Sequence, residues 1–222
     1  MTSSSAVSQS ESEPRASERP RGLDWPDWSG RTAVLIATGP SLTPADVALV
    51  HHARAVDRCR VIAINEAGLR QYIPLAAPWA DVLYAADRTW WEFYRPEFYG
   101  LRVSGESVPT VHTRPLKMLE RGEKMPRQPG SVVSAGHSGF QALGLALTLG
   151  ASRVYLLGYD CGGKKRNCHE NRPKQFSKDT AMDQWVQHYN RVPVEWPEVP
   201  VINCAADSRI TAFEKRPLSE VL

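Results

Sequence analysis

Short apolar runs alternate with helical patterns along most of the chain, and each apolar run ends at a polar or glycine-containing turn. The first run covers residues 32–37 and leads into a helical pattern at 43–53. Thr43 can cap that helix, and Pro44 suits its first turn. Because the run is continuously apolar, it predicts a strand buried on both faces of a parallel sheet.

The same order of strand, turn and helix recurs toward the C-terminus. Further apolar runs lie at 60–65, 80–87, 108–113, 152–160 and 199–204. Helical patterns follow at 66–72, 88–94 and 139–150. The last is apolar on most of its surface, which indicates a buried crossover helix that Gly150 closes. We therefore predict an α/β, Rossmann-like fold with a mostly parallel sheet of about six strands and helices on both faces.

The segments outside this pattern are polar. Residues 1–22 are rich in Ser, Glu, Arg and Pro, which predicts a disordered N-terminal tail. The folded domain is expected to begin at about residue 23, where Trp25 and Trp28 look like aromatic anchors. Basic and polar stretches at 116–130 and 161–178 predict long surface loops.

Composition narrows the class of protein further. The chain has 222 residues, of which 42% are hydrophobic and 23% charged, with a formal net charge of +3, so we expect one globular domain. The charge is too small to imply nucleic acid by itself. With no apolar run of bilayer length and no secretory leader, we expect a soluble, cytoplasmic protein whose four cysteines stay reduced.

Polar and small residues follow the first predicted strand. They are Thr38, Gly39, Pro40 and Ser41, ahead of a helix N-terminus whose free N–H groups can bind a phosphate. A plain tight turn explains the same residues equally well. The chain contains neither GxGxxG nor GxxxxGK[ST], which argues against nicotinamide-dependent redox chemistry and P-loop phosphoryl transfer.

Further candidate residues follow the second and third strands. The amide of Asn65 could read a base or a ribose edge, and Asp87 could hold a sugar hydroxyl or a metal. Each of the two could equally be a helix cap.

Two more groups are expected at the same sheet edge. His137, Ser138 and Gly139 stand at the start of the crossover helix, where Ser138 could serve as the N-cap, an anion ligand or both. After the strand at 152–160, Tyr159 could donate to a phosphate, while Asp160 could instead cap a turn.

The loop at 161–174 holds a histidine among basic residues. His169 is a candidate general base or a solvated surface histidine. Cationic neighbours that could neutralise a diphosphate, or form a solvated charged surface, are Lys164, Lys165, Arg166, Arg172 and Lys174. Cys161, Cys168 and His169 lack the usual spacing of a zinc site, so we predict no metal there.

Three stretches together resemble one superfamily. They are ATGPSL at 37–42, HSGFQALGLALTLGASRVYLLGYD at 137–160 and VINCAADSRITAFEKRPLSEVL at 201–222. The pattern is similar to the Rossmann-like family of motility-accessory-factor glycosyltransferases, 6-hydroxymethylpterin pyrophosphokinases and small phage-encoded relatives, and more distantly to family-42 bacterial sialyltransferases. The resemblance implies that residues 23–222 form a single nucleotide-binding domain.

The sialyltransferases hold a cytidine nucleotide sugar without a metal, using positions that match Gly39, Pro40, Ser41, Asn65, Ser138 and Gly139 here. The resemblance also implies a loop histidine as general base, a role that His169 fills by position. The loop reads NCHENRP, which departs from the H-W-x-G-D-H-P-like run of the phage relatives.

Sequence alone thus favours a nucleotide-sugar-dependent glycosyltransferase that needs no cofactor. One alternative is magnesium-dependent diphosphate transfer from ATP to a pterin-like alcohol, with Asp87 or Asp160 holding Mg²⁺. Another is a non-catalytic nucleotide-binding protein. The acceptor stays open and includes nucleic acid, since the basic loops at 117–127 and 164–174 permit it. Self-association into a homo-oligomer also stays open.

Overall fold

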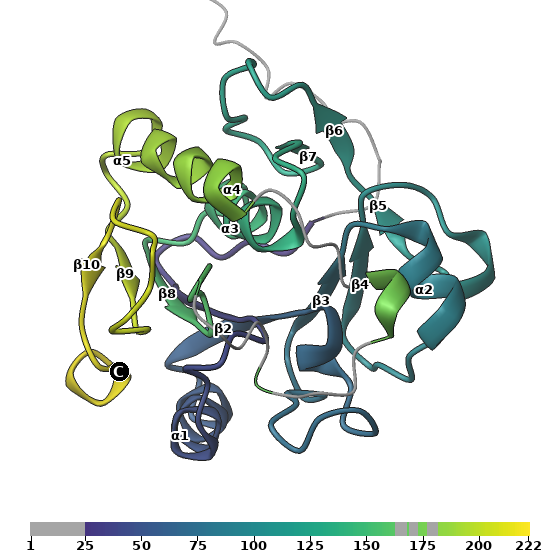
Figure 1. Ribbon diagram of the computed structural model, residues 1–222, viewed down its shortest axis with the longest axis horizontal. Helices are drawn as coiled ribbons and strands as arrows, with labels where there is room; N and C mark the ends of the chain where they lie inside the picture. The colour runs from purple at the N-terminus through teal and green to yellow at the C-terminus, as the bar shows by residue number, and fades with distance from the viewer. Residues whose placement is uncertain (1–24, 163–167, 169–172, 177–181) are drawn as a thin grey trace, which may run out of the picture.

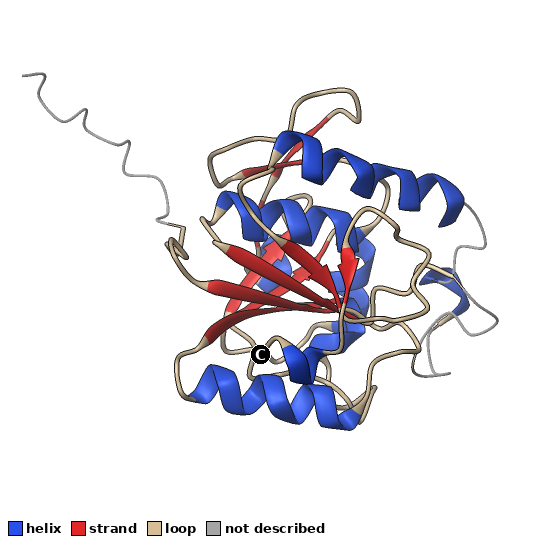
Figure 2. Ribbon diagram, turned by 90° about the vertical axis from the view of Figure 1, so that its left-hand side faces the viewer, coloured by secondary structure: helices blue, strands red, loops and turns tan. Residues whose placement is uncertain are grey.

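The computed structural model describes residues 25–162, 168, 173–176 and 182–222 (Figure 1). The tail predicted at 1–22 lies outside the described residues. Within the described part the chain forms a central parallel sheet between two helical layers, as Figure 2 shows from the side.

The sheet has eight strands in the order β10-β9-β8-β1-β2-β3-β4-β5, and every neighbouring pair is parallel. The strands are β1 Thr32–Ile36, β2 Cys59–Ile64, β3 Val82–Ala85, β4 Leu101–Ser104, β5 Arg114–Pro115, β8 Arg153–Leu157, β9 Val201–Asn203 and β10 Glu214–Lys215. A second parallel pair consists of β6 Lys117–Leu119 and β7 Ser131–Val133. The predicted class is confirmed, but the sheet has more strands than the six expected.

The helices of the described residues cover both faces of the sheet (Figure 2). They are α1 Pro44–Ala55, α2 Arg88–Tyr94, α3 Ser138–Thr148, α4 Met182–His188 and α5 Val192–Glu195, with 3₁₀ turns η1 Asn65–Gly68, η2 Pro109–Val111, η3 Lys174–Phe176, η4 Tyr189–Arg191 and η5 Leu218–Glu220. α1 starts as predicted: the Thr43 hydroxyl accepts from the N–H of Asp46 at 3.1 Å, and Pro44 is its first residue.

The core divides into one cluster on each face of the sheet. In β1, Ala33 and Leu35 pack with α3, whereas Val34 and Ile36 pack with α1. This alternation follows from the two-residue period of a strand, and it explains why the strands are apolar throughout. Trp28 is buried against the α3 cluster, which confirms its predicted role as an anchor.

Three parts of the sequence pattern were misread. The run at 108–113 forms the turn η2, because Pro109 has no N–H to donate to a ladder, and the strand follows at β5. The helix expected at 66–72 is only η1. The strands β4 and β10 were missed because they are short and partly polar.

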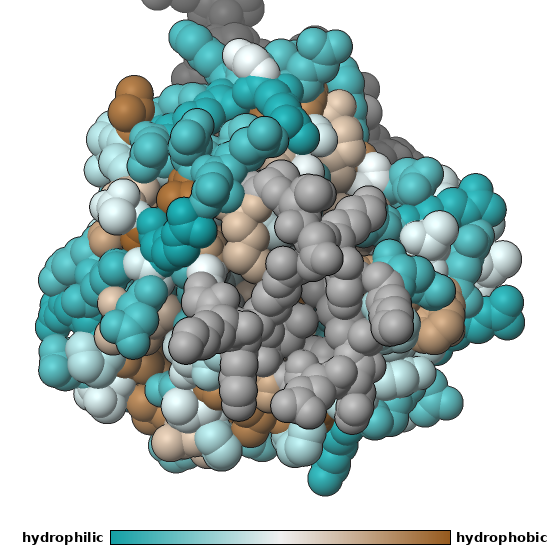
Figure 3. Space-filling view, in the orientation of Figure 1, coloured by the Kyte–Doolittle hydropathy of each residue, from teal (hydrophilic) through white to brown (hydrophobic). Residues whose placement is uncertain are grey.

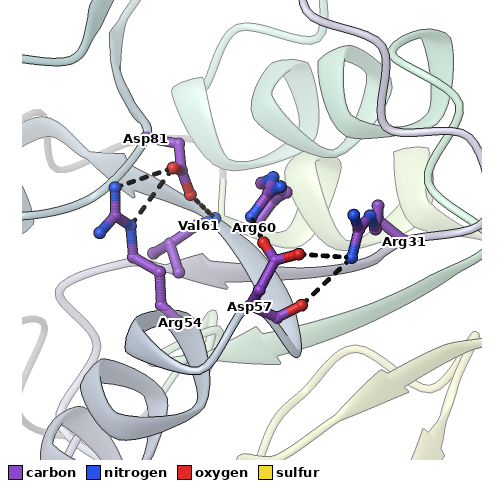
Figure 4. Close-up of polar contacts among 6 residues, drawn as sticks. All are labelled: Arg31, Arg54, Asp57, Arg60, Val61 and Asp81. Carbon is purple, nitrogen blue, oxygen red and sulfur yellow. Dashed lines mark hydrogen bonds and ion pairs between the residues drawn. The ribbon is translucent and has the colours of Figure 1, made fainter.

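Acidic side chains hold the amino ends of the strands together (Figure 4). Asp81 accepts from the backbone N–H of Val61 at 2.7 Å and pairs with Arg54 at 3.0 Å. Asp57 bridges Arg31 and Arg60. The Asp81 pair is the better shielded, with side chains 21% and 33% exposed, so it contributes more to stability than the exposed Asp57 bridge.

We predict that Asp81→Ala lowers the free energy of unfolding by about 1–3 kcal/mol, because it leaves the buried N–H of Val61 without its acceptor and Arg54 without its charge partner. Urea denaturation measures the change. Asp57→Asn is the control, with a smaller effect, because asparagine tolerates the left-handed backbone of Asp57 (φ +60°). Equal losses in the two variants would contradict the argument.

Candidate functional site

A cavity of about 270 Å³ opens at the carboxyl ends of the strands. It lies where the strand order changes direction, since β1 is flanked by β2 on one side and β8 on the other. Open parallel sheets bind ligands at this kind of switch point. Segments following β1, β2, β3 and β8 contribute Thr38, Gly39, Asn65, Asp87, Gly158 and Tyr159, and the start of α3 adds His137, Ser138 and Gly139.

The two central turns meet closely at the cavity floor. The N–H of Gly39 donates to the carbonyl of Gly158 at 3.0 Å, and a Cβ on Gly39 would lie 2.3 Å from that oxygen. Gly158 has φ +67° and itself packs on the carbonyl of Ala37. Only glycine fits at both positions, because each turn lies against the backbone of the other.

Asp160 is hydrogen-bonded to the turn that follows β1. Its carboxylate accepts from the Ser41 N–H at 3.1 Å and from the Ser41 hydroxyl at 2.8 Å. Its pKa is raised, mainly because the side chain is buried, while the Ser41 bonds oppose the rise. Of the candidates named from sequence, Pro40, Ser41 and Asp160 therefore lie beside the cavity wall and not among the residues that line it.

The amino end of α3 forms the opposite wall. His137 is its N-cap, and Nδ1 accepts from the Phe140 N–H at 3.4 Å. Ser138, the cap suggested by sequence, instead accepts through Oγ from the Ala86 N–H at 3.2 Å, which ties α3 to the end of β3. The Tyr159 hydroxyl donates to the Gly139 carbonyl at 3.0 Å, so this hydroxyl is already engaged.

Aromatic residues make the environment of His137 apolar. Its ring stacks on Trp185 with 5.0 Å between centroids and lies 5.4 Å from Tyr189. Burial lowers the pKa of His137 to about 3, with His188 adding to the effect, so the ring is neutral at physiological pH. Burial also raises the pKa of Tyr189 well above its ordinary value.

Polarity in the cavity comes mostly from neutral groups. Asn65 has a left-handed backbone (φ +53°) at the end of β2, a conformation that asparagine tolerates. Burial raises the pKa of the Cys161 thiol to about 12. Within the described lining, the exposed Asp87 at the start of α2 is the one acidic side chain, and no Lys or Arg is present.

His169 and the basic residues Lys164, Lys165, Arg166 and Arg172 lie outside the described residues, as does the side chain of Lys174. Cys168 is described, and its N–H donates to the Thr38 carbonyl at 2.7 Å. This bond fixes the residue before His169 beside the cavity wall. The described part of the chain has no group of three or more metal-ligating side chains, and the four cysteines are unpaired.

One side of the cavity was not predicted from the sequence, and residues in the C-terminal third of the chain form it. That side consists of Gln175, Phe176, Met182, Trp185 and Tyr189. Trp185 and Tyr189 are four residues apart, which is the spacing of one helical face. That spacing was the available signal, but the nearby polar loop obscured it.

Comparisons with known proteins identify the fold. A solved structure titled MAf glycosyltransferase, from Magnetospirillum magneticum AMB-1, is similar with a TM-score of 0.59 and 17% identity, over 88% of this chain and 35% of that one. At this identity the likeness shows a shared fold, and this chain spans about a third of that protein. No family model and no curated protein matches the sequence. No helix among the described residues has the length and apolarity to cross a membrane.

We predict that Gly39→Ala destabilises the fold by about 1–3 kcal/mol, because the added Cβ would lie 2.0 Å from Oδ2 of Asp160 and 2.3 Å from the Gly158 carbonyl. Gly122→Ala is the control, since its Cβ would meet nothing within 4 Å. Thermal unfolding compares them, and an unchanged midpoint in Gly39→Ala would refute the close packing.

The neutral His137 predicts a loss of stability in acid. Unfolded histidine binds a proton near pH 6.5, whereas folded His137 does so only near pH 3, so the free energy of unfolding falls as the pH drops through this window. His137→Asn keeps a capping side chain and should reduce the difference in stability between pH 7 and pH 4.5. Denaturation at both pH values measures it, with the exposed His52→Asn expected to behave as wild type.

Proposed function

We propose that this chain is a glycosyltransferase that takes a sugar from a nucleotide donor bound in the cavity at the β1/β8 switch point. One observation carries the proposal: a cavity of small-ligand size joins turns from four parallel strands to the amino end of α3. The fold shared with a structure titled as a glycosyltransferase supports it. The finer suggestion of a sialyltransferase-like, phage-type enzyme rests on the sequence resemblance.

In this proposal the phosphate of the donor binds at the start of α3. The first N–H groups of a helix have no partners within the helix, and the helix dipole favours an anion there. Gly139 lines the cavity with its backbone, and a side chain there would crowd the wall, because a Cβ would lie 3.1 Å from the Tyr189 hydroxyl. Asn65 would read the nucleoside, and the apolar side of Phe176 and Trp185 would cover the bound donor.

The reaction would join an acceptor hydroxyl oxygen to the anomeric carbon of the sugar. The bond from that carbon to the phosphate oxygen breaks, and the nucleotide leaves with the electron pair. A base removes the hydroxyl proton, and we assign this role to His169. The backbone N–H of its chain neighbour Cys168 donates a hydrogen bond to the Thr38 carbonyl at the cavity. Asp87, at the mouth, would hold a sugar hydroxyl. No metal is required by this scheme.

The proposal is tested by binding a panel of CMP-, UDP-, GDP- and ADP-linked sugars, with Mg²⁺-ATP alongside. A nucleotide sugar that binds the folded protein should raise its melting temperature. Asn65→Gly keeps a left-handed backbone but removes the amide, so it should weaken binding of the responding nucleotide sugar by about tenfold.

The control for Asn65→Gly is Asp57→Gly. Asp57 also has a left-handed backbone (φ +60°) but lies at the amino ends of the strands, away from the cavity, so this variant should bind as wild type. A response to Mg²⁺-ATP alone would favour diphosphate transfer instead. Binding without turnover on any acceptor, nucleic acid included, and unchanged by His169→Ala, would favour a non-catalytic nucleotide-binding protein.

A further inference from the structure

A short turn between β6 and β7 is fixed to the helical layer beside the cavity. Arg191 donates from Nη1 to the Arg121 carbonyl at 2.6 Å and from Nη2 to the Glu123 carbonyl. Arg191 is held in turn by Glu195, 2.7 Å from Nε, and the other carboxylate oxygen of Glu195 accepts from the Met125 N–H at 2.6 Å. The turn at 121–125 therefore has a fixed position relative to α5.

This attachment brings the side chain of Arg121 to the cavity. A Cβ on Gly136, which lines the cavity, would lie 3.0 Å from Nη2 of Arg121 and 3.6 Å from Nε1 of Trp185. Gly136 is two residues before α3 begins, so the guanidinium lies near the amino end of that helix. The pKa of His188 gives independent support: it is lowered first by burial and then by the charges of Arg121 and Arg191.

The charge of Arg121 is not neutralised by an ion pair within the described structure. Among the described residues its guanidinium has no carboxylate partner, whereas Arg127 in the same segment pairs with Glu198 and stacks on Trp196. Arg121 is exposed. The described face over α4 and α5 is mainly hydrophilic (Figure 3). The described lining of the cavity contains no Lys or Arg, so a cation for an anionic ligand must come from outside the lining.

We propose that Arg121 is the cation that binds the phosphate groups of the nucleotide donor at the amino end of α3. This inference rests on the proposed function and adds a binding residue to it. A guanidinium matches two phosphate oxygens at once, and its charge complements the helix dipole. The donor would therefore be held by α3 from one side and by the turn at 121–125 from the other.

The test uses inorganic pyrophosphate, CMP and the responding nucleotide sugar as probes, with calorimetry on the full chain. Arg121→Gln should weaken binding of every phosphate-bearing probe by about tenfold or more, because a charged hydrogen-bond donor is lost. Arg121→Lys should recover part of the affinity. Arg153→Gln is the matched control, since Arg153 is exposed and lies at the amino end of β8, whereas the cavity lies at the carboxyl end.

The outcomes separate this inference from the proposed function. If pyrophosphate binding depends on Arg121 but no nucleotide sugar binds, the phosphate site stands and the glycosyltransferase proposal fails. If a nucleotide sugar binds equally to wild type and Arg121→Gln, the proposed function stands and the role of Arg121 is wrong. If wild type binds none of the probes, both are overturned. Circular dichroism of each variant establishes that the fold is retained.

Discussion

The contact between the backbones of Gly39 and Gly158 is the constraint on which the site depends. Here β1 and β8 end side by side, and the two turns that follow are hydrogen-bonded to each other. Side chains at either position would push the turns apart, because the neighbouring carbonyl oxygens lie within 2.6 Å of the added Cβ atoms. The cavity floor is formed by this close approach, and the ligand space lies between turns that the sheet positions.

Polar groups around this contact divide into supporting and accessible ones. The Asp160 carboxylate accepts a hydrogen bond from Ser41, and the Tyr159 hydroxyl donates one to the Gly139 carbonyl. His137 is neutral and caps α3. What stays accessible is the amino end of α3, with Asn65 and Asp87 across the cavity. In the proposed function, affinity for an anionic donor would come from the backbone N–H groups of α3 and from Arg121 beside the cavity.

The molecule therefore has different kinds of interaction at the amino and the carboxyl ends of its strands. At the amino edge, Asp81 and Asp57 are paired with arginines and contribute to stability. At the carboxyl ends of the strands, the described cavity lining contains one acidic side chain, Asp87, and no Lys or Arg. Burying the strands on both faces gives a rigid support for the accessible groups, and the described cysteines form no disulfide.

The sequence by itself determined the α/β class, the helix α3 and the turns after β1, β2, β3 and β8, because strand burial and helix capping are local and periodic. It also named eight of the nineteen residues that line the cavity, since the carboxyl ends of parallel strands lie on the same side of the sheet. Only the tertiary structure decided that Ser41 and Asp160 pair behind the wall, that Trp185 stacks on His137, and that Arg121 reaches Gly136. These contacts join residues far apart in the chain, and no local pattern encodes them.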